Sequence, residues 1–143
     1  MAADPSLTHV PAFSLRDLDG RNRQLEEFLG REPLLLEFMS PDCPHCLEMA
    51  PILTRLYADY GKRIQFLTVA FDRDAGRVRS FRRLEMHPWP YLMGTQEVIK
   101  AYRLEGVPTF FLVANDGRVV KSQLGSTSSE AMRQLLEDLL AAH

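Results

Sequence analysis

The sequence predicts an α/β fold, with a central mixed β-sheet that carries helices on both faces. Nearly continuous apolar runs at 34–39 and 64–71 are typical of strands that are buried on both faces. Helical segments follow both runs, and a hairpin and a last helix close the chain. Because 143 residues suit one domain, we expect a single domain at 9–143 after a flexible N-terminus at 1–8.

The N-terminal part of the domain predicts an extension ahead of the first buried strand. In FSLRDL, residues 13–18, apolar and polar residues alternate as in a short strand. The pair Asp19-Gly20 that follows favours a turn or hairpin. RQLEEFL, residues 23–29, then predicts a brief helix.

An amphipathic helix is expected after the first buried strand. Pro44 suits the first helical position, where its missing amide proton costs nothing, and this places Cys43 at the N-cap. Apolar residues then recur at helical spacing to about Gly61. Pro51 is expected to kink this helix, because it lacks the amide proton that the helix needs there.

The second half of the chain continues the alternation of strands and helices. Its expected elements are helices at 75–84 and 96–104, an irregular proline-rich connection at 87–93, a hairpin of 109–113 and 118–124, and a final helix at 128–143. Asp116-Gly117 forms the corner of the hairpin. Thr127 and Glu130 are placed as a capping box for the final helix.

The composition gives no case for a nucleic-acid or membrane protein. The net charge is −2 with acids and bases interspersed. No stretch approaches the ~20 apolar residues of a membrane span, and the N-terminus lacks the basic start and apolar core of a signal peptide. One arginine cluster is interpreted as a solvated helix face, with a docking patch for an acidic partner as the alternative; it comprises Arg73, Arg77, Arg79, Arg82 and Arg83.

SPDCPHC, residues 40–46, contains both cysteines of the chain. A bridge between cysteines three residues apart closes so small a loop that it would stabilise little. A zinc site usually needs four ligands, commonly from two cysteine pairs. His9, His87 and His143 are scattered and each is expected at the surface. A redox-active pair is therefore favoured, and a copper or zinc module is the alternative.

The helix start gives Cys43 and Cys46 unequal chemistry. Unpaired amides and the positive end of the helix dipole favour a thiolate at Cys43, and the thiolate is the nucleophile. Cys46 lies one turn further along the same face and is expected to be more buried, so it would resolve the mixed disulfide. His45 adds a donor and, when protonated, a charge that favours the thiolate; the alternative is a solvent-facing side chain without a role.

Glu37 is an ionisable residue in an otherwise apolar strand. Burying its charge without a partner costs several kcal/mol, so burial is expected to raise the pKa of Glu37. A carboxyl that is half-ionised near neutral pH could take the proton from Cys46 when that thiol attacks. The alternative is a glutamate at the edge or end of the sheet that reaches water.

These features together resemble the thioredoxin superfamily over nearly the whole chain. The resemblance rests on the order of a buried strand, a Cys-x-x-Cys motif at a helix start, Pro51, GVPTFFLV at 106–113, an Asn-Asp-Gly hairpin and a final helix. PAFSLRDLDGRNRQLEEFLG, residues 11–30, is similar to the TlpA and ResA group of bacterial redoxins. EFMSPDCPHC, residues 37–46, is instead similar to the active site of DsbA.

The resemblance implies a thioredoxin-like fold and a thiol-disulfide oxidoreductase that acts on protein dithiols and disulfides. It implies a redox partner protein, no bound cofactor or metal, and a monomer. Glu37 stands where relatives have a buried acid, Pro108 at the cis-proline beside the active site, and Val107 where the backbone pairs with substrate. Such relatives usually work outside the cytoplasm, which favours an extracytoplasmic location and leaves a cytoplasmic one open.

Two departures from the family pattern leave the physiological direction open. Met39 and Asp42 stand where many relatives have aromatic residues, and the charge of Asp42 opposes a thiolate at Cys43. The physiological direction, oxidant or reductant, is therefore not predicted. The rival enzyme is a peroxidase of the peroxiredoxin type, but Ser40 replaces the threonine of that family's motif and Leu36 replaces its proline.

Overall fold

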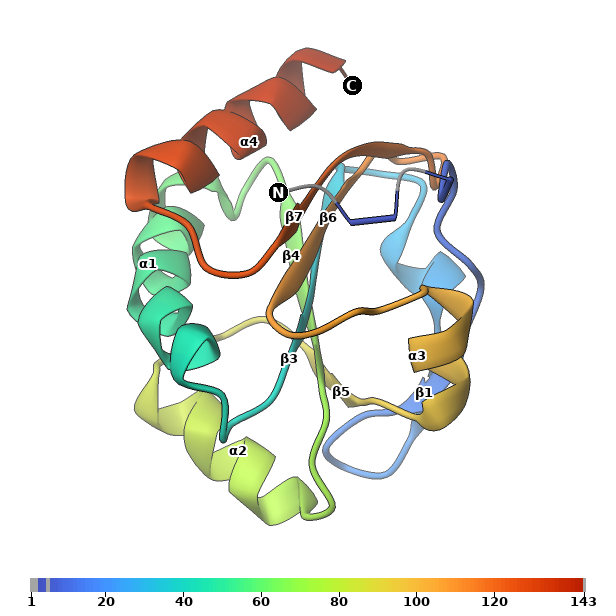
Figure 1. Ribbon diagram of the computed structural model, residues 1–143, viewed down its shortest axis with the longest axis vertical. Coiled ribbons are helices and arrows are strands. Elements are labelled where there is room, and N and C mark those ends of the chain that lie inside the picture. The colour runs from blue at the N-terminus through green and yellow to red at the C-terminus, as the bar shows by residue number, and fades with distance from the viewer. Residues whose placement is uncertain (1–2, 5, 143) are drawn as a thin grey trace.

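The computed structural model describes residues 3–4 and 6–142 and contains a five-stranded mixed sheet between two layers of helices (Figure 1). The strands of this sheet are β3 (Leu34–Met39), β4 (Gln65–Ala70), β5 (Tyr91–Met93), β6 (Thr109–Val113) and β7 (Val119–Leu124). Their order is β5-β4-β3-β6-β7, with β3, β4 and β5 parallel and β6 antiparallel to both of its neighbours. The predicted α/β class and mixed sheet are confirmed.

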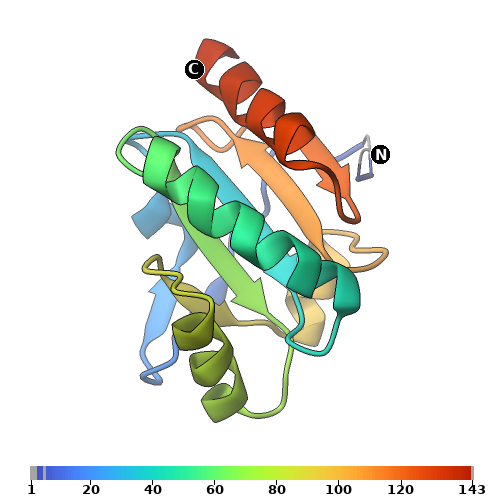
Figure 2. The ribbon, with the colours of Figure 1, turned by 90° about the vertical axis from the view of Figure 1, so that its left-hand side faces the viewer.

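Helices cover both faces of the sheet, as predicted. They are α1 (Pro44–Tyr60), α2 (Ala75–Leu84), α3 (Gln96–Ala101) and α4 (Ser129–Ala142). The helices α1, α2 and α4 lie on one face, with α1 in front of the sheet in Figure 2, and α3 lies on the other. The predicted N-terminal extension is a hairpin with a short 3-10 helix, which lies on the α3 side; its elements are β1 (Ser14–Arg16), β2 (Asn22–Gln24) and η1 (Leu25–Phe28).

The central strand β3 divides the core into two clusters. All six of its residues are buried, and alternate side chains of a strand point to opposite faces. Leu35 and Met39 belong to the cluster under α1, whereas Leu34 and Phe38 belong to the cluster on the other face. Glu37 therefore shares the face of Leu35 and Met39 and is directed towards α1.

The prediction of an irregular connection at 87–93 is wrong for its last three residues, which form β5. The strand β5 starts directly after Pro90 and pairs in parallel with β4, where Tyr91 lies opposite Thr68. Proline does not donate to a strand ladder, and the strand that follows is only three residues long. The local sequence therefore carries too little alternation to predict β5.

Two predicted details of helix ends are also wrong. The helix α3 ends at Ala101 and not at residue 104, because Arg103 has a φ of 52° in the left-handed region. The predicted capping box of Thr127 and Glu130 does not form the start of α4. Ser128 caps this helix instead, and its Oγ accepts the Ala131 amide at 3.1 Å.

Other expected elements agree with the structure. Cys43 is the N-cap of α1, and this helix reaches Tyr60 with Pro51 inside it, while the kink expected at Pro51 stays a prediction. The hairpin of β6 and β7 turns at Gly117, which has a φ of 94° that glycine adopts without strain. Residues 1, 2 and 5 lie outside the described residues, so the flexible segment at 1–8 stays a prediction.

His87 is buried, which corrects the surface position expected for it. Its Nε2 lies 2.9 Å from the Ala50 carbonyl of α1, so Nε2 carries the proton. Its Nδ1 lies 2.6 Å from the Tyr91 hydroxyl and accepts from it, while the ring stacks on Trp89 at 4.1 Å. Burial, with a contribution from nearby Arg82, lowers the pKa of His87 to about 4. Neutral His87 thus joins α1 to the connection between α2 and β5.

We expect His87 to make the fold sensitive to acid. The pKa of His87 is about 4 in the folded state, against an ordinary value of 6.5, so only the unfolded chain takes up a proton as the pH falls from 6.5. The free energy of unfolding should therefore fall by up to about 3 kcal/mol between pH 6.5 and 4. His87→Gln, whose amide can bond Ala50 and Tyr91 without titrating, should lose this component.

Denaturant unfolding at pH 4.5 and 7 measures the effect. The exposed His9 supplies the matched control His9→Gln, which should keep the pH dependence of the unmodified chain. Equal pH dependence in the unmodified chain and in His87→Gln would contradict the assignment to His87.

Candidate active site

The cysteine pair lies at the start of α1, directly after the central strand β3. Cys43 has extended backbone at the N-cap and its Sγ accepts the Cys46 amide at 3.3 Å. Pro44 follows at the first helical position. Cys43 is half-buried whereas Cys46 is 1% exposed, and both are free thiols. The expected difference in burial between the two cysteines is confirmed.

The environment of Cys46 opposes ionisation. Burial raises the pKa of the Cys46 thiol far above its usual range, and its interaction with Cys43 and the charge of Glu37 raise it further. Cys46 is therefore a thiol at neutral pH, and it needs a base before it can attack a disulfide.

Glu37 lies beneath this helix start and is 4% exposed. Its Oε1 accepts a hydrogen bond from Thr68 Oγ1 of the neighbouring strand β4 at 2.8 Å. Burial raises the pKa of Glu37 to about 7, although the Thr68 hydrogen bond works in the opposite direction. The expected burial and raised pKa are confirmed, and a position at the edge or end of the sheet that reaches water is excluded, because β3 pairs on both sides.

Sequence reasoning did not identify Thr68 and Trp89 as partners of this carboxyl group. Trp89 Nε1 donates to Thr68 Oγ1 at 2.9 Å, so the threonine hydroxyl directs its own proton to Glu37. The available signal was Thr68 itself, a polar residue inside the apolar run at 64–71.

Val107 and Pro108 reach the cysteines from the start of β6. The Val107-Pro108 peptide bond is cis, as the resemblance implied. The Val107 carbonyl accepts from Cys43 Sγ at 3.5 Å. Because β6 runs antiparallel to β3, its first residues lie beside the end of β3, and this brings Val107 to the half-buried sulfur.

The side chain of His45 is directed along α1 towards Glu48. Its Nδ1 lies 2.9 Å from Glu48 Oε1 and 3.3 Å from Ser126 Oγ, and its side chain is 63% exposed. Any positive charge on His45 is therefore shared with the Glu48 carboxylate. Its predicted contribution to the Cys43 thiolate stays a prediction.

Asp42 has a partner that sequence reasoning missed. Its carboxylate forms an ion pair with Arg77 of α2. Arg77 also pairs with Asp72, where Nη1 and Oδ2 are 3.2 Å apart. Arg77 was visible only as a member of the arginine cluster, and its position beside the active-site loop depends on how α2 packs.

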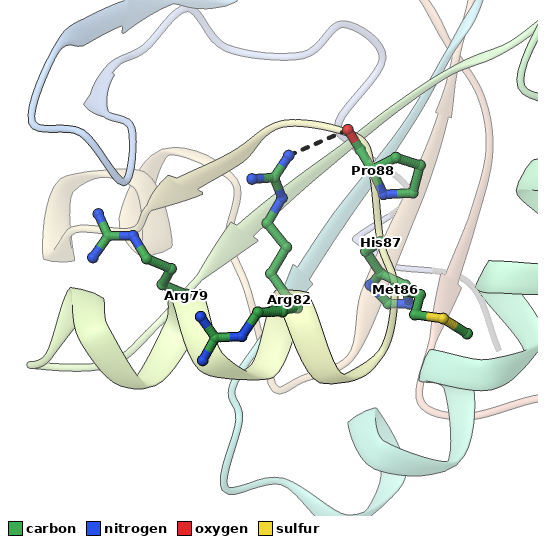
Figure 3. Close-up of a pocket in the computed structure, with 6 residues that line it drawn as sticks. Arg79, Arg82, Met86, His87 and Pro88 are labelled. Carbon is green, nitrogen blue, oxygen red and sulfur yellow. Dashed lines mark hydrogen bonds between the residues drawn. The ribbon is translucent and has the colours of Figure 1, made fainter.

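Three other arginines of the cluster line a cavity of about 480 Å³ between α2 and the connection to β5 (Figure 3). Its lining residues are Arg79, Arg82, Arg83, Met86, His87 and Pro88. Figure 3 shows Arg82 turned to the Pro88 carbonyl, to which it donates at 3.2 Å, and it also donates to Trp89 at 3.0 Å. Arg79 bonds the Leu18 carbonyl. The cluster is therefore partly structural, and no cysteine lines this cavity.

The described part of the chain offers neither a metal-ligand set nor a membrane-spanning helix. Among residues 3–4 and 6–142, no group of three His, Cys, Asp or Glu side chains is placed to hold a metal ion. The metal-module alternative therefore has no ligand set within those residues, and His143 lies outside them. No helix in the same residues is both long and apolar enough to cross a bilayer.

Comparison with known proteins identifies the family. The Redoxin family model matches residues 5–140. The thiol-disulfide oxidoreductase ResA of Geobacillus thermodenitrificans is 30% identical over 132 residues, which are 91% of this chain and 75% of the relative. A thiol:disulfide interchange protein of the thioredoxin family from Chlorobium tepidum superimposes with a TM-score of 0.81 at 22% identity, over 96% of this chain and 99% of that one.

A second solved structure agrees with the first. A putative thioredoxin from Neisseria meningitidis gives a TM-score of 0.78 at 26% identity, over 94% of this chain and 91% of that one. The predicted thioredoxin-like fold, the ResA-like resemblance and the activity in thiol-disulfide exchange are confirmed. The chain belongs to the redoxin family and is a ResA-like thiol-disulfide oxidoreductase.

Proposed function

We propose that Cys43 is the sulfur that exchanges with protein substrates and that Cys46 is the resolving sulfur. The observation that carries this assignment is the difference in burial between the two thiols at one helix start. Cys43 Sγ accepts a hydrogen bond from the Cys46 amide and Cys43 is half-buried, whereas Cys46 is 1% exposed. A substrate disulfide can approach the first sulfur, but the second can react only within the protein.

The exchange consists of two displacements, in each of which a thiolate replaces another sulfur of a disulfide. The Cys43 thiolate attacks a substrate disulfide, one substrate sulfur becomes bonded to Cys43, and the other leaves as a thiolate. Glu37 then accepts the Cys46 proton, and the Cys46 thiolate attacks Cys43 and releases the second substrate sulfur. The products are a Cys43-Cys46 disulfide and a reduced substrate, and the reverse sequence oxidises a substrate dithiol.

Glu37 suits the proposed proton transfer because its pKa of about 7 lies near neutral pH. A carboxyl with an ordinary pKa would be a weaker base for the buried Cys46 thiol. The Thr68 hydrogen bond holds one carboxylate oxygen at 2.8 Å. In the reverse reaction the proton returns from Glu37 to the Cys46 thiolate, because the pKa of this buried thiol lies above that of Glu37.

Val107 and Pro108 form the proposed edge for the substrate chain. The Val107 carbonyl is 3.5 Å from Cys43 Sγ, so a peptide paired with this backbone would carry its own sulfur to Cys43. Pro44 contributes by starting the helix that orients Cys43. His45 lies at the exposed rim, where it would meet the substrate.

We propose that Cys43 exchanges with protein dithiols, protein disulfides and one redox partner protein.

We also propose that the protein works as a monomer. Both edges of the sheet carry a backbone contact that makes pairing with the sheet of another molecule less accessible. Asp17 forms a bridge to Leu92 of β5, and the Val119 amide of β7 donates to Thr8 at 2.8 Å.

Removing the resolving thiol should trap the substrate. In Cys46→Ser the first displacement can occur, but the mixed disulfide cannot be resolved from within the protein. We expect mixed disulfides through Cys43 to accumulate, which non-reducing gels and mass spectrometry of the linked peptides measure.

Cys43→Ser is the matched control and should trap almost nothing, because the Cys46 sulfur is buried. Equal or greater trapping through Cys46 in this variant would reverse the assignment of the two roles.

Replacing Glu37 should slow resolution and not attack. General base catalysis typically contributes at least ~100-fold, so Glu37→Gln should slow decay of the mixed disulfide by about this factor at pH 7. In the unmodified chain the resolution rate should rise with pH through about 7, since only ionised Glu37 accepts the proton. Stopped-flow measurement with a peptide disulfide separates the two steps.

Thr68→Val is a second variant, which should shift the pH profile of the resolution rate and not abolish its inflection. It removes a hydrogen bond that lowers the pKa of Glu37, so the inflection near pH 7 should move to higher pH. An inflection near pH 7 that survives in Glu37→Gln would show that another group is the base.

A further inference from the structure

A linked pair of ion pairs joins the active-site loop to the helix α2. Asp42 immediately precedes Cys43, and its carboxylate pairs with the Arg77 guanidinium. Arg77 Nη1 lies 3.2 Å from Asp72 Oδ2. The guanidinium thus stands between two carboxylates, one on the loop that carries the attacking sulfur and one at the end of β4.

Asp72 is the fixed side of this arrangement. Its side chain is 4% exposed, and its Oδ1 accepts the Asp74 amide at 2.8 Å. The preceding residue, Phe71, donates its amide to the Met39 carbonyl at 2.8 Å, which ties the end of β4 to the end of β3. Arg77 is therefore held through Nη1 from the sheet side, and its Nη2 donates to Asp42.

Neighbouring arginines on α2 do not occupy this position. Arg79 bonds the Leu18 carbonyl and lies 3.9 Å from Asp19. Arg82 donates to the carbonyl of Trp89. Arg77 is the member of this helix that is paired with the loop residue next to the attacking sulfur.

We propose that Arg77 is a positioning residue for thiol-disulfide exchange, which holds Asp42 away from Cys43 and compensates its negative charge. An uncompensated carboxylate beside the sulfur disfavours the thiolate, and stabilising the thiolate favours the reduced form and makes the disulfide more oxidising. Arg77 therefore shifts the pair towards oxidation of its substrates. This inference rests on the proposed role of Cys43.

The exposure of the Arg77 and Asp42 side chains sets the size of the expected effect on the redox equilibrium. The side chains of Arg77 and Asp42 are 51% and 66% exposed, so their charges act through a largely aqueous medium and are screened by salt. We expect Arg77→Gln to lower the oxidising equilibrium constant against glutathione by about 3- to 10-fold at low salt. The rate of Cys43 alkylation by iodoacetamide at a fixed pH should fall by a similar factor.

A double-mutant cycle tests the contact itself. Asp42→Asn should raise both the oxidising equilibrium constant against glutathione and the rate of Cys43 alkylation. In that background Arg77 is held by Asp72 alone and is no longer drawn to the loop, so Arg77→Gln should have less than half of its original effect. An equal effect of Arg77→Gln in both backgrounds would overturn the proposed ion-pair mechanism, and no effect in either would overturn any role for Arg77.

Two further measurements separate this role from a purely structural one. Arg79→Gln removes the same charge from the same helix and should change the equilibrium less than 2-fold. In 1 M salt the Arg77→Gln effect should shrink to less than half, because exposed charges are then screened within a few ångströms. An effect that is equal at both salt concentrations would instead show a structural role and overturn the proposal.

Failure of this inference is distinguishable from failure of the proposed function. If Cys43 is not the exchanging sulfur, Cys46→Ser will not trap substrates through Cys43. If only the Arg77 proposal is wrong, trapping will proceed normally and the glutathione equilibrium will be unchanged by Arg77→Gln.

Discussion

The junction between the central strand and α1 is the constraint on which the site depends. The strand β3 pairs with β4 on one side and β6 on the other, so the position at which it delivers the chain to Cys43 is fixed. The amide of Cys46 then bonds the Cys43 sulfur at the N-cap. Glu37 comes from the same strand, Val107 from the start of antiparallel β6, and Asp72 from the end of parallel β4. All of them meet at the carboxyl end of β3, the edge where open α/β sheets place their sites.

The two sulfurs lie in different electrostatic environments. Cys46 and Glu37 are buried, so desolvation controls their ionisation and neither depends strongly on salt. Cys43 is half-buried beside Asp42, whose side chain is mostly exposed. The proposed attack by Cys43 and resolution by Cys46 would therefore be tuned by different physical effects, and surface substitutions would alter the first without altering the second. The sequence motif alone does not reveal this division, since Thr68 and Arg77, the partners of Glu37 and Asp42, lie far from it in the sequence.

Local patterns predicted much of the fold and the core of the site. The buried strand, the helix start at Pro44, the N-cap Cys43 and the buried Glu37 depend on short stretches of sequence, and all are present. The missed features depend on contacts between distant segments. Thr68 meets Glu37 only because β3 and β4 pair in one particular register, and His87 is buried only because the fold supplies partners for both of its ring nitrogens.

A series of buried hydrogen bonds and one ring stack connects Glu37 to His87. The Trp89 indole donates to Thr68, which leaves the Thr68 proton for Glu37. The same indole ring stacks on His87 at 4.1 Å, and His87 holds the Ala50 carbonyl in the middle of α1. The position of Trp89 is thus set by the packing of α1, and it in turn orients the hydroxyl group that restrains the pKa of Glu37. A change that loosens this packing would release Thr68 and alter the proposed proton transfer between Cys46 and Glu37, although it touches neither cysteine.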